Sequence, residues 1–282
     1  MKPSNDFVNL SKNFWANIRS ISQKSGYTEK NTRRIKIPSP EEIKAVFTDL
    51  NLTYHHLIEA NNKLTPQGIK VIDYFKYRAD ILNTYVEPRL MDANKAKKLF
   101  KDLKKQYKPK CPLPMNKQKG AKKAPAYFTG MINILIEAHS KGFDCDYSPR
   151  ELTTITRNGQ PLRTLARWVD GAFPRSVNPV AIWEIKEYYY TTTFGSRVAD
   201  GVYESLLDGM ELEELHEHEG IKVLHYLMVD SHYTWWVCGK SYLCRLIDSL
   251  HMGYVDEILF GHEVVEKLSE IVSAWVKLAN KK

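Results

Sequence analysis

Apolar residues recur every three or four positions through the first third of the chain. This spacing predicts amphipathic helices over residues 7–21, 43–50 and 69–82. Two helix starts are marked by their caps: Ser39 precedes Pro40 and is followed by Glu42 as a capping box, and Thr65 precedes Pro66. We therefore expect a mainly helical N-terminal region.

The pattern changes at residue 126. A helix is predicted over residues 127–140, and strand-like apolar segments follow at 164–173 and 180–188, with a turn at Asn158-Gly159 before them. A polar helix at 196–216, a strand at 222–229 and two C-terminal helices complete the order. The sequence thus predicts an α/β fold, a mixed sheet flanked by helices, behind the helical region.

Length and composition suit a globular chain. Its 282 residues are enough for one large domain or two ordinary ones, and 43% are hydrophobic. No stretch approaches the roughly eighteen apolar residues of a membrane span, and the first residues do not resemble a signal peptide, so we expect a cytoplasmic protein without a membrane partner. The cysteines have no zinc-site or disulfide spacing and are expected to be reduced: Cys111, Cys145, Cys238 and Cys244.

Charge is distributed unevenly. Residues 1–125 hold 26 Lys and Arg against 11 Asp and Glu, whereas residues 126–282 hold 15 against 22. Residues 94–125 alone contain twelve lysines and one acid, Asp102. A lysine run is often only a solvated surface, but within so basic a half it favours contact with the phosphates of DNA.

These features suggest three parts: a helical, basic region at 1–107 for binding a polyanion such as DNA, a basic linker at 108–125 and an α/β domain at 126–282. The expected DNA contacts in the basic half are Arg33, Arg34, Lys36, Lys104, Lys105, Lys122 and Lys123.

Two acids and a lysine interrupt the apolar strands of the second half. If residues 164–173 and 180–188 pair as antiparallel neighbours around a loop centred on Val177, Asp170 lies opposite Glu184. Lys186 then points to the same face as Glu184, while Trp183 faces the core. Two adjacent buried carboxylates need a positive charge between them, and Mg²⁺ is bound by such oxygen ligands. The alternative is a surface hairpin on which these side chains are merely solvated.

The arrangement Asp170…Glu184-Ile185-Lys186, on a helix, three strands, helix, strand order, resembles the PD-(D/E)XK nuclease superfamily, which includes most type II restriction endonucleases. The resemblance covers about residues 127 to 230. It implies Asp170, Glu184 and the Ile185 main-chain carbonyl as ligands of Mg²⁺, for which Mn²⁺ can substitute, and Lys186 as the residue that positions the attacking water. It adds Glu137 as a possible further ligand, although a solvent-facing helix acid fits that position equally well. Val169 stands where the motif has proline.

The start of the helix at 196 is a second candidate contact. Ser196 as a cap and Arg197 in the first turn would bind a DNA phosphate, or Ser196 serves only as a cap. Asp200 and Glu204, further along this helix, could lie behind the metal ligands and contact them, but we expect them to be solvated acids.

Together these features predict a Mg²⁺-dependent, sequence-specific endonuclease for double-stranded DNA, a bacterial type II restriction enzyme. We expect a homodimer, because cutting both strands calls for two sites, and a cognate DNA methyltransferase as a companion. The alternatives are a DNA repair or recombination nuclease and a non-catalytic DNA-binding protein.

Overall fold

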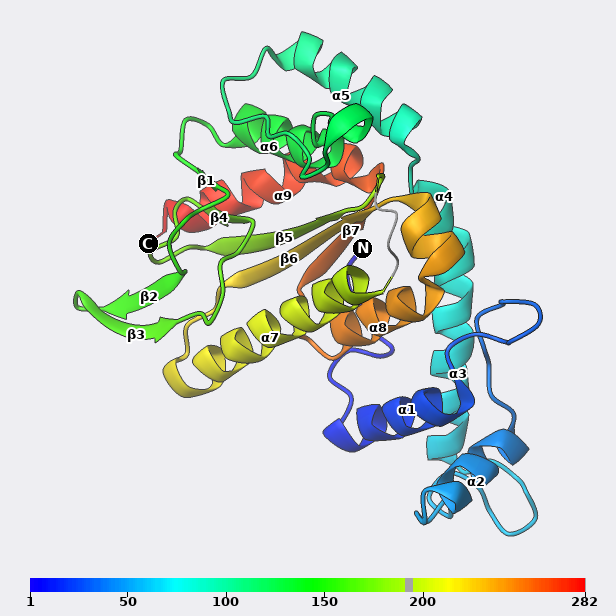
Figure 1. Cartoon of the computed structure of the whole chain (residues 1–282). Coiled ribbons are helices and arrows are strands. Elements are labelled where there is room, and N and C mark those ends of the chain that lie inside the picture. The colour runs from blue at the N-terminus through cyan, green and yellow to red at the C-terminus, as the bar shows by residue number, and fades with distance from the viewer. Residues whose placement is uncertain (191–194, 282) are drawn as a thin grey trace.

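The computed structural model describes residues 1–190 and 195–281, without the side chains of residues 196 and 197. At its centre is a five-stranded mixed sheet with helices on both faces (Figure 1). Its strands, in spatial order, are β1 (Asp146–Tyr147), β4 (Gly171–Phe173), β5 (Ala181–Glu187), β6 (Leu224–Asp230) and β7 (Glu257–Phe260).

Strand direction changes at the middle of the sheet. β1 pairs antiparallel with β4, and β4 with β5, whereas β5, β6 and β7 are parallel. Parallel neighbours need crossover connections. Here they contain α7 (Ser196–Glu219), the π-helical η3 (His232–Cys238) and α8 (Lys240–His251).

Each face of the sheet has its own layer of helices. One face is covered by α5 (Ala93–Tyr107), α6 (Tyr127–His139) and α9 (Glu263–Ala279), and the other by α7 and α8 (Figure 1). Side chains of β5 alternate between the faces. Trp183 belongs to the core under α6 and α9 and stacks on Trp275 at 5.5 Å between ring centroids, whereas Ile182 packs toward α7. The predicted orientation of Trp183 is confirmed.

The N-terminal region is helical, as predicted. Its helices are α1 (Lys12–Ser25), α2 (Pro40–Asp49) and α3 (Pro66–Ile81), followed by the π-helical η1 (Leu82–Val86) and the short α4 (Glu87–Arg89). Ser39 and Glu42 form the expected capping box, and the Thr65 hydroxyl accepts a hydrogen bond from the backbone N–H of Gly68.

A buried ion pair joins this region to the sheet domain. Arg78 on α3 is fully buried, and its Nη1 donates to both carboxylate oxygens of Asp248 on α8 at 3.0 Å. Tyr74 donates to the same carboxylate at 2.6 Å. The N-terminal helices are therefore fixed to α8 by a polar contact that water does not reach.

The prediction for the strands before Asp170 is partly wrong. β2 (Thr154–Arg157) and β3 (Gln160–Thr164) form a separate two-stranded sheet, closed by the expected Asn158-Gly159 turn, in which both residues have positive φ. Residues 165–170 are an irregular loop, so the predicted strand at 164–173 is reduced to β4. The short strand β7 was not predicted.

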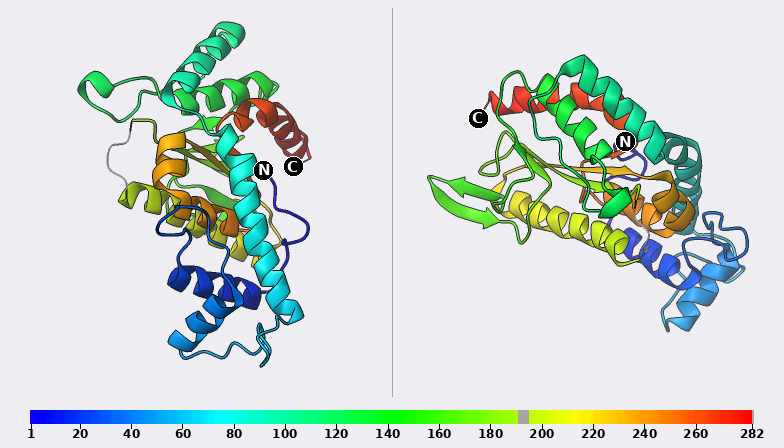
Figure 2. Two further views of the ribbon diagram at one scale, coloured as in Figure 1. Left: turned by 90° about the vertical axis from the view of Figure 1, so that its right-hand side faces the viewer. Right: turned by 45° about the horizontal axis from the view of Figure 1, so that its top comes forward.

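The lysine-rich α5 lies at the end of the molecule opposite α1 and α2, and the long helix α3 runs between the two ends (Figure 2). Between α5 and α6 the chain forms a loop with a bridge from Met115 to Pro125 and a 3-10 turn, η2 (Gly120–Lys122). No helix in residues 1–190 and 195–281 combines the length and apolar character needed to cross a membrane.

Candidate active site

The loop before β4 brings two charged residues to the α7 face of the sheet. Leu165 and Val169 are buried and fix its ends, whereas Trp168 between them is 60% exposed. Gly171 follows directly, and a Cβ atom there would lie 2.1 Å from the Trp183 ring, so only glycine fits. The loop thus reaches the sheet at a fixed point and carries Arg167 and Asp170 there.

Asp170 and Glu184 are adjacent across the sheet. Gly171 pairs with Trp183, so the next position places Asp170 opposite Glu184, as the sequence predicts. The Asp170 N–H donates to Glu184 Oε1 at 3.1 Å, and the Ile185 N–H donates to Asp170 Oδ2 at 2.8 Å. Because the N–H and C=O of a strand residue point to the same side, the Ile185 carbonyl also points toward Asp170.

Lys186 lies on the same buried face. Its ammonium donates to Glu184 Oε2 at 2.8 Å and to Glu204 Oε2 at 2.7 Å. Glu204 is on α7, which approaches closely at Gly201, where a Cβ atom would lie 3.1 Å from Lys186 Cδ. Glu204 is therefore not the simply solvated acid that we expected.

Arg167 bridges β5 and α7. Its Nη2 donates to Glu184 Oε2 at 2.9 Å, and its Nη1 donates to Asp208 Oδ2 at 2.5 Å. Asp208 lies one turn beyond Glu204 on α7 and is fully buried. Glu204 Oε2 is 3.5 Å from the same Arg167 Nη2.

We call this group the acid cluster. Within the described residues it has four carboxylates and two cations: Asp170, Glu184, Glu204 and Asp208, with Arg167 and Lys186. With all six ionised, negative charge exceeds positive charge by two.

This imbalance alters the pKa values. Burial, helped by the charge of Glu184, raises the pKa of Asp170 to about 6, although Lys186 opposes the shift. Burial likewise raises the pKa of Asp208 to about 7, against the effect of Arg167. Burial alone would raise the pKa of Glu184, but Lys186 and Arg167 bring it below its ordinary value. Burial alone would lower the pKa of Lys186, but Glu184 and Asp170 raise it, so Lys186 stays protonated.

The acid cluster fits a divalent cation in charge and in ligand type. Asp208 Oδ1 is buried without a hydrogen-bond partner in the described part of the chain. The described residues contain no group of three or more His, Cys, Asp or Glu side chains placed to hold a metal ion. Mg²⁺, however, is commonly bound by one or two carboxylates with water in its remaining positions. Asp170 and Glu184 could serve as that pair.

Glu137 is not brought to this cluster. It lies on α6, on the other face of the sheet, and its carboxylate accepts the Lys110 N–H at 2.9 and 3.3 Å. There it lines a hollow of about 420 Å³ together with Asp144 and Asp146.

The predicted DNA contacts occupy several surfaces. Arg33 and Arg34 are exposed in the loop between α1 and α2, and Lys36 in the same loop pairs with Glu42 at 2.5 Å. Ser196 and Arg197 begin α7 with Gly195 as the N-cap, so Ser196 is not the cap; both side chains lie outside the described part.

The lysines of residues 95–123, which we call the lysine tract, are exposed to solvent. All twelve of its lysines are exposed, including Lys104, Lys105, Lys122 and Lys123. The ion pairs that lysines form in the described chain involve others: Lys24, Lys36, Lys76, Lys186 and Lys222. The tract is therefore a positive surface that the described acids do not neutralise.

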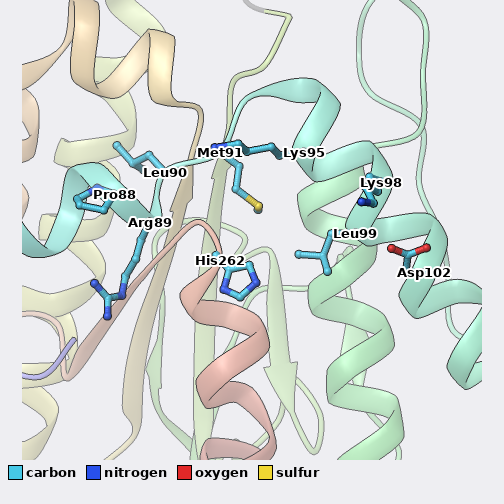
Figure 3. Close-up of a pocket in the computed structure, with 9 residues that line it drawn as sticks. All are labelled: Pro88, Arg89, Leu90, Met91, Lys95, Lys98, Leu99, Asp102 and His262. Carbon is cyan, nitrogen blue, oxygen red and sulfur yellow. The ribbon is translucent and has the colours of Figure 1, made fainter.

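A second hollow, of about 300 Å³, lies where α4 leads into α5 and β7 into α9 (Figure 3). Met91, Leu99 and His262 line it, with Lys95 and Lys98 from the lysine tract beside them (Figure 3). It is bounded by α5 and α9, which cover the face opposite α7, so it does not belong to the acid cluster.

Sequence reasoning missed Arg167 and Asp208 and misread Glu204. A signal for the two acids was present: Glu204 and Asp208 are four residues apart on one helix face, and Gly201 on the preceding turn marks a close approach. Arg167 carried no comparable signal, because its position depends on a loop that was predicted to be a strand.

Family models identify two segments of the chain. Residues 1–85 match the model of a family described as domain of unknown function (DUF7690), and residues 91–275 match that of the domain of unknown function (DUF7687). No curated protein and no solved structure matches the chain. The two matches meet at α4, between the helical region and the sheet domain that contains the acid cluster. The match to residues 91–275 covers more than half of the 282-residue chain, so the chain belongs to the DUF7687 family.

Proposed function

We propose that this protein is a metal-dependent endonuclease that hydrolyses phosphodiester bonds in double-stranded DNA at specific sequences, in the manner of a type II restriction enzyme. The observation that carries the proposal is the contact of Asp170 with Glu184 and of Glu184 with Lys186, on one buried face of the sheet. A fully buried carboxylate beside a second, partly buried one is costly to maintain, and such clusters are typical of functional sites.

Two further features support the proposal. The chain order α6, β1, β4, β5, α7, β6 agrees with the helix, three strands, helix, strand order expected of a PD-(D/E)XK-like core, with the β2–β3 hairpin as an insertion. The unneutralised lysine tract supplies the positive surface that DNA phosphates require.

In this proposal Asp170, Glu184 and the Ile185 carbonyl would hold Mg²⁺, or Mn²⁺ in its place. The bound metal would supply an activated water and stabilise charge on the phosphate. Lys186 donates hydrogen bonds and remains protonated, so it would orient the water rather than remove its proton. Asp170 must lose its proton to serve as a ligand, which its pKa of about 6 permits at neutral pH.

The proposed partners follow from the reaction. A duplex has two strands to cut, so we propose a homodimer with one acid cluster per strand. A sequence-specific nuclease in a bacterial cytoplasm needs its own DNA protected, which favours a companion methyltransferase.

The test is conversion of supercoiled plasmid to nicked and linear forms by the purified protein. We expect cleavage with Mg²⁺, none with EDTA, and none with Glu184→Gln, while Lys222→Met, an exposed lysine paired with Asp256, cuts normally. Discrete fragments would indicate a restriction enzyme, and cleavage confined to branched or mismatched DNA a repair nuclease.

A non-catalytic DNA-binding protein is the second candidate. It is favoured by the complete pairing of Glu184, whose two oxygens already accept hydrogen bonds from Asp170, Arg167 and Lys186. Such a protein would shift DNA equally well with and without Mg²⁺ and would leave the plasmid intact.

A further inference from the structure

Arg167 occupies the position that a cation between Glu184 and α7 would take. Its guanidinium holds Glu184 with one nitrogen and Asp208 with the other, at 2.9 and 2.5 Å. Both carboxylates are fully buried. Arg167 therefore already compensates part of the negative charge that would attract a metal.

Glu184 has little capacity left for a metal while this contact persists. Its Oε1 accepts the Asp170 N–H, and its Oε2 accepts both Arg167 and Lys186. A carboxylate has about four lone-pair sites, and three of them are used here, so at most one on Oε1 remains for a metal. A guanidinium beside that site repels the incoming cation, so withdrawal of one of the two cations on Glu184 would both free Oε2 and remove the repulsion.

The geometry points to Arg167 as the one that withdraws. Its side chain is 21% exposed and extends from an irregular loop between the exposed residues Ala166 and Trp168. Lys186, in contrast, is buried near the C-terminal end of β5, on a regular strand, and is closely covered by Gly201 of α7.

Arg167 also has a second acceptor within reach. The nitrogen that holds Glu184 lies 3.5 Å from Glu204 Oε2, and the other nitrogen can keep Asp208. A small rotation about the Asp208 contact would exchange Glu184 for Glu204 without leaving the guanidinium unpaired.

We propose that Arg167 is a movable internal counter-ion that must release Glu184 before a divalent cation can bind there, and that it thereby sets the metal affinity of the site. The inference rests on the proposed metal site but not on cleavage. In this proposal Arg167 is a positioning residue with two alternative ion-pair partners. It pairs with Glu184 in the metal-free site and with Glu204 when the metal is bound.

The test is Mn²⁺ binding measured by titration calorimetry on wild type and Arg167→Met at one pH, without DNA. Removing a unit positive charge beside the ligands should lower the Kd for Mn²⁺ by roughly tenfold or more. Arg163→Met is the matched control, because Arg163 on β3 pairs with Glu211 and Glu214 of α7 away from Glu184. Its Mn²⁺ affinity should equal that of wild type.

Folding is checked by circular dichroism. If Arg167→Met does not fold, Arg167→Lys keeps the charge but cannot hold two carboxylates as a fork, and it should still bind Mn²⁺ more tightly than wild type. Addition of Glu184→Gln to either variant should remove the gain and so locate the bound ion.

The outcomes separate this inference from the proposed function. Tighter Mn²⁺ binding by the variant supports it, whether or not the protein cuts DNA. Equal or weaker binding overturns it even if wild type is an active nuclease. Absence of Mn²⁺ binding in wild type and variant alike overturns it together with the metal site.

Discussion

Replacing Lys186 by Met separates the structural role of the acid cluster from its proposed chemistry. Met keeps most of the side-chain volume but removes the ammonium that contacts Glu184 at 2.8 Å and Glu204 at 2.7 Å. Glu204 is 39% exposed, so that contact contributes little once solvent screening is considered. The loss of folding stability in Lys186→Met is therefore determined by the contact with Glu184, which is fully buried.

Breaking a buried ion pair on one side costs about 3–5 kcal/mol. We expect the lower end, about 3 kcal/mol in the free energy of unfolding, because Arg167 still neutralises Glu184 in Lys186→Met. The double variant Glu184→Gln/Lys186→Met leaves no orphaned charge at this position and should recover most of that loss. Cleavage should fall by about 100-fold or more in Lys186→Met and should not recover in the double variant.

Urea unfolding gives the stabilities, and plasmid cleavage corrected for the folded fraction gives the activities. Lys222→Met is the matched control and should change the unfolding free energy by less than about 1 kcal/mol, because its pair with Asp256 is exposed. Our reasoning is refuted if Lys186→Met cleaves DNA at the wild-type rate, or if the double variant recovers activity along with stability.

Three other predictions concern the interdomain contact, the lysine tract and the pH dependence. Asp248→Asn removes the charge partner of the fully buried Arg78 and should lower the free energy of unfolding in urea by about 3–5 kcal/mol; a change below 1 kcal/mol would contradict it. Lys104→Ala with Lys105→Ala should weaken DNA binding and reduce the slope of log K against log salt by about 0.9 for each lost phosphate contact, with unchanged thermal stability; an unchanged slope would exclude these lysines as contacts. Asp208, with its pKa raised to about 7, keeps in the folded chain a proton that the unfolded chain releases near pH 4, so wild-type stability should fall as pH rises through this window. Asp208→Asn should lessen that fall by up to about 1.4 kcal/mol per pH unit, and identical slopes would refute the assignment.

Local patterns were enough to predict much of the fold. The caps at Ser39 and Thr65 fix helix starts through contacts with residues three positions further along, so the sequence shows them directly. The position of Asp170 opposite Glu184 was also predictable, because the loop that joins two antiparallel strands determines which of their residues pair.

Residues that meet through tertiary structure were not predictable in the same way. Residues 165–170 look like a strand because they are partly apolar, but Leu165 and Val169 are buried as loop anchors beside the β2–β3 hairpin. That packing decides where Arg167 points, and no local pattern encodes it. Glu137 shows the opposite case. Its helix was predicted close to its observed bounds, but the helix packs on the face of the sheet opposite the acid cluster, and no local pattern showed which face that would be.

The most direct test of the acid cluster as a nuclease site compares wild type with Asp170→Asn on one supercoiled plasmid, after a gel shift without metal shows equal DNA binding. We predict that wild type converts the plasmid to nicked and linear forms only when Mg²⁺ is present, and that Asp170→Asn binds the DNA but leaves it supercoiled. Intact plasmid with wild type and Mg²⁺, or cleavage by Asp170→Asn at the wild-type rate, would contradict the central claim.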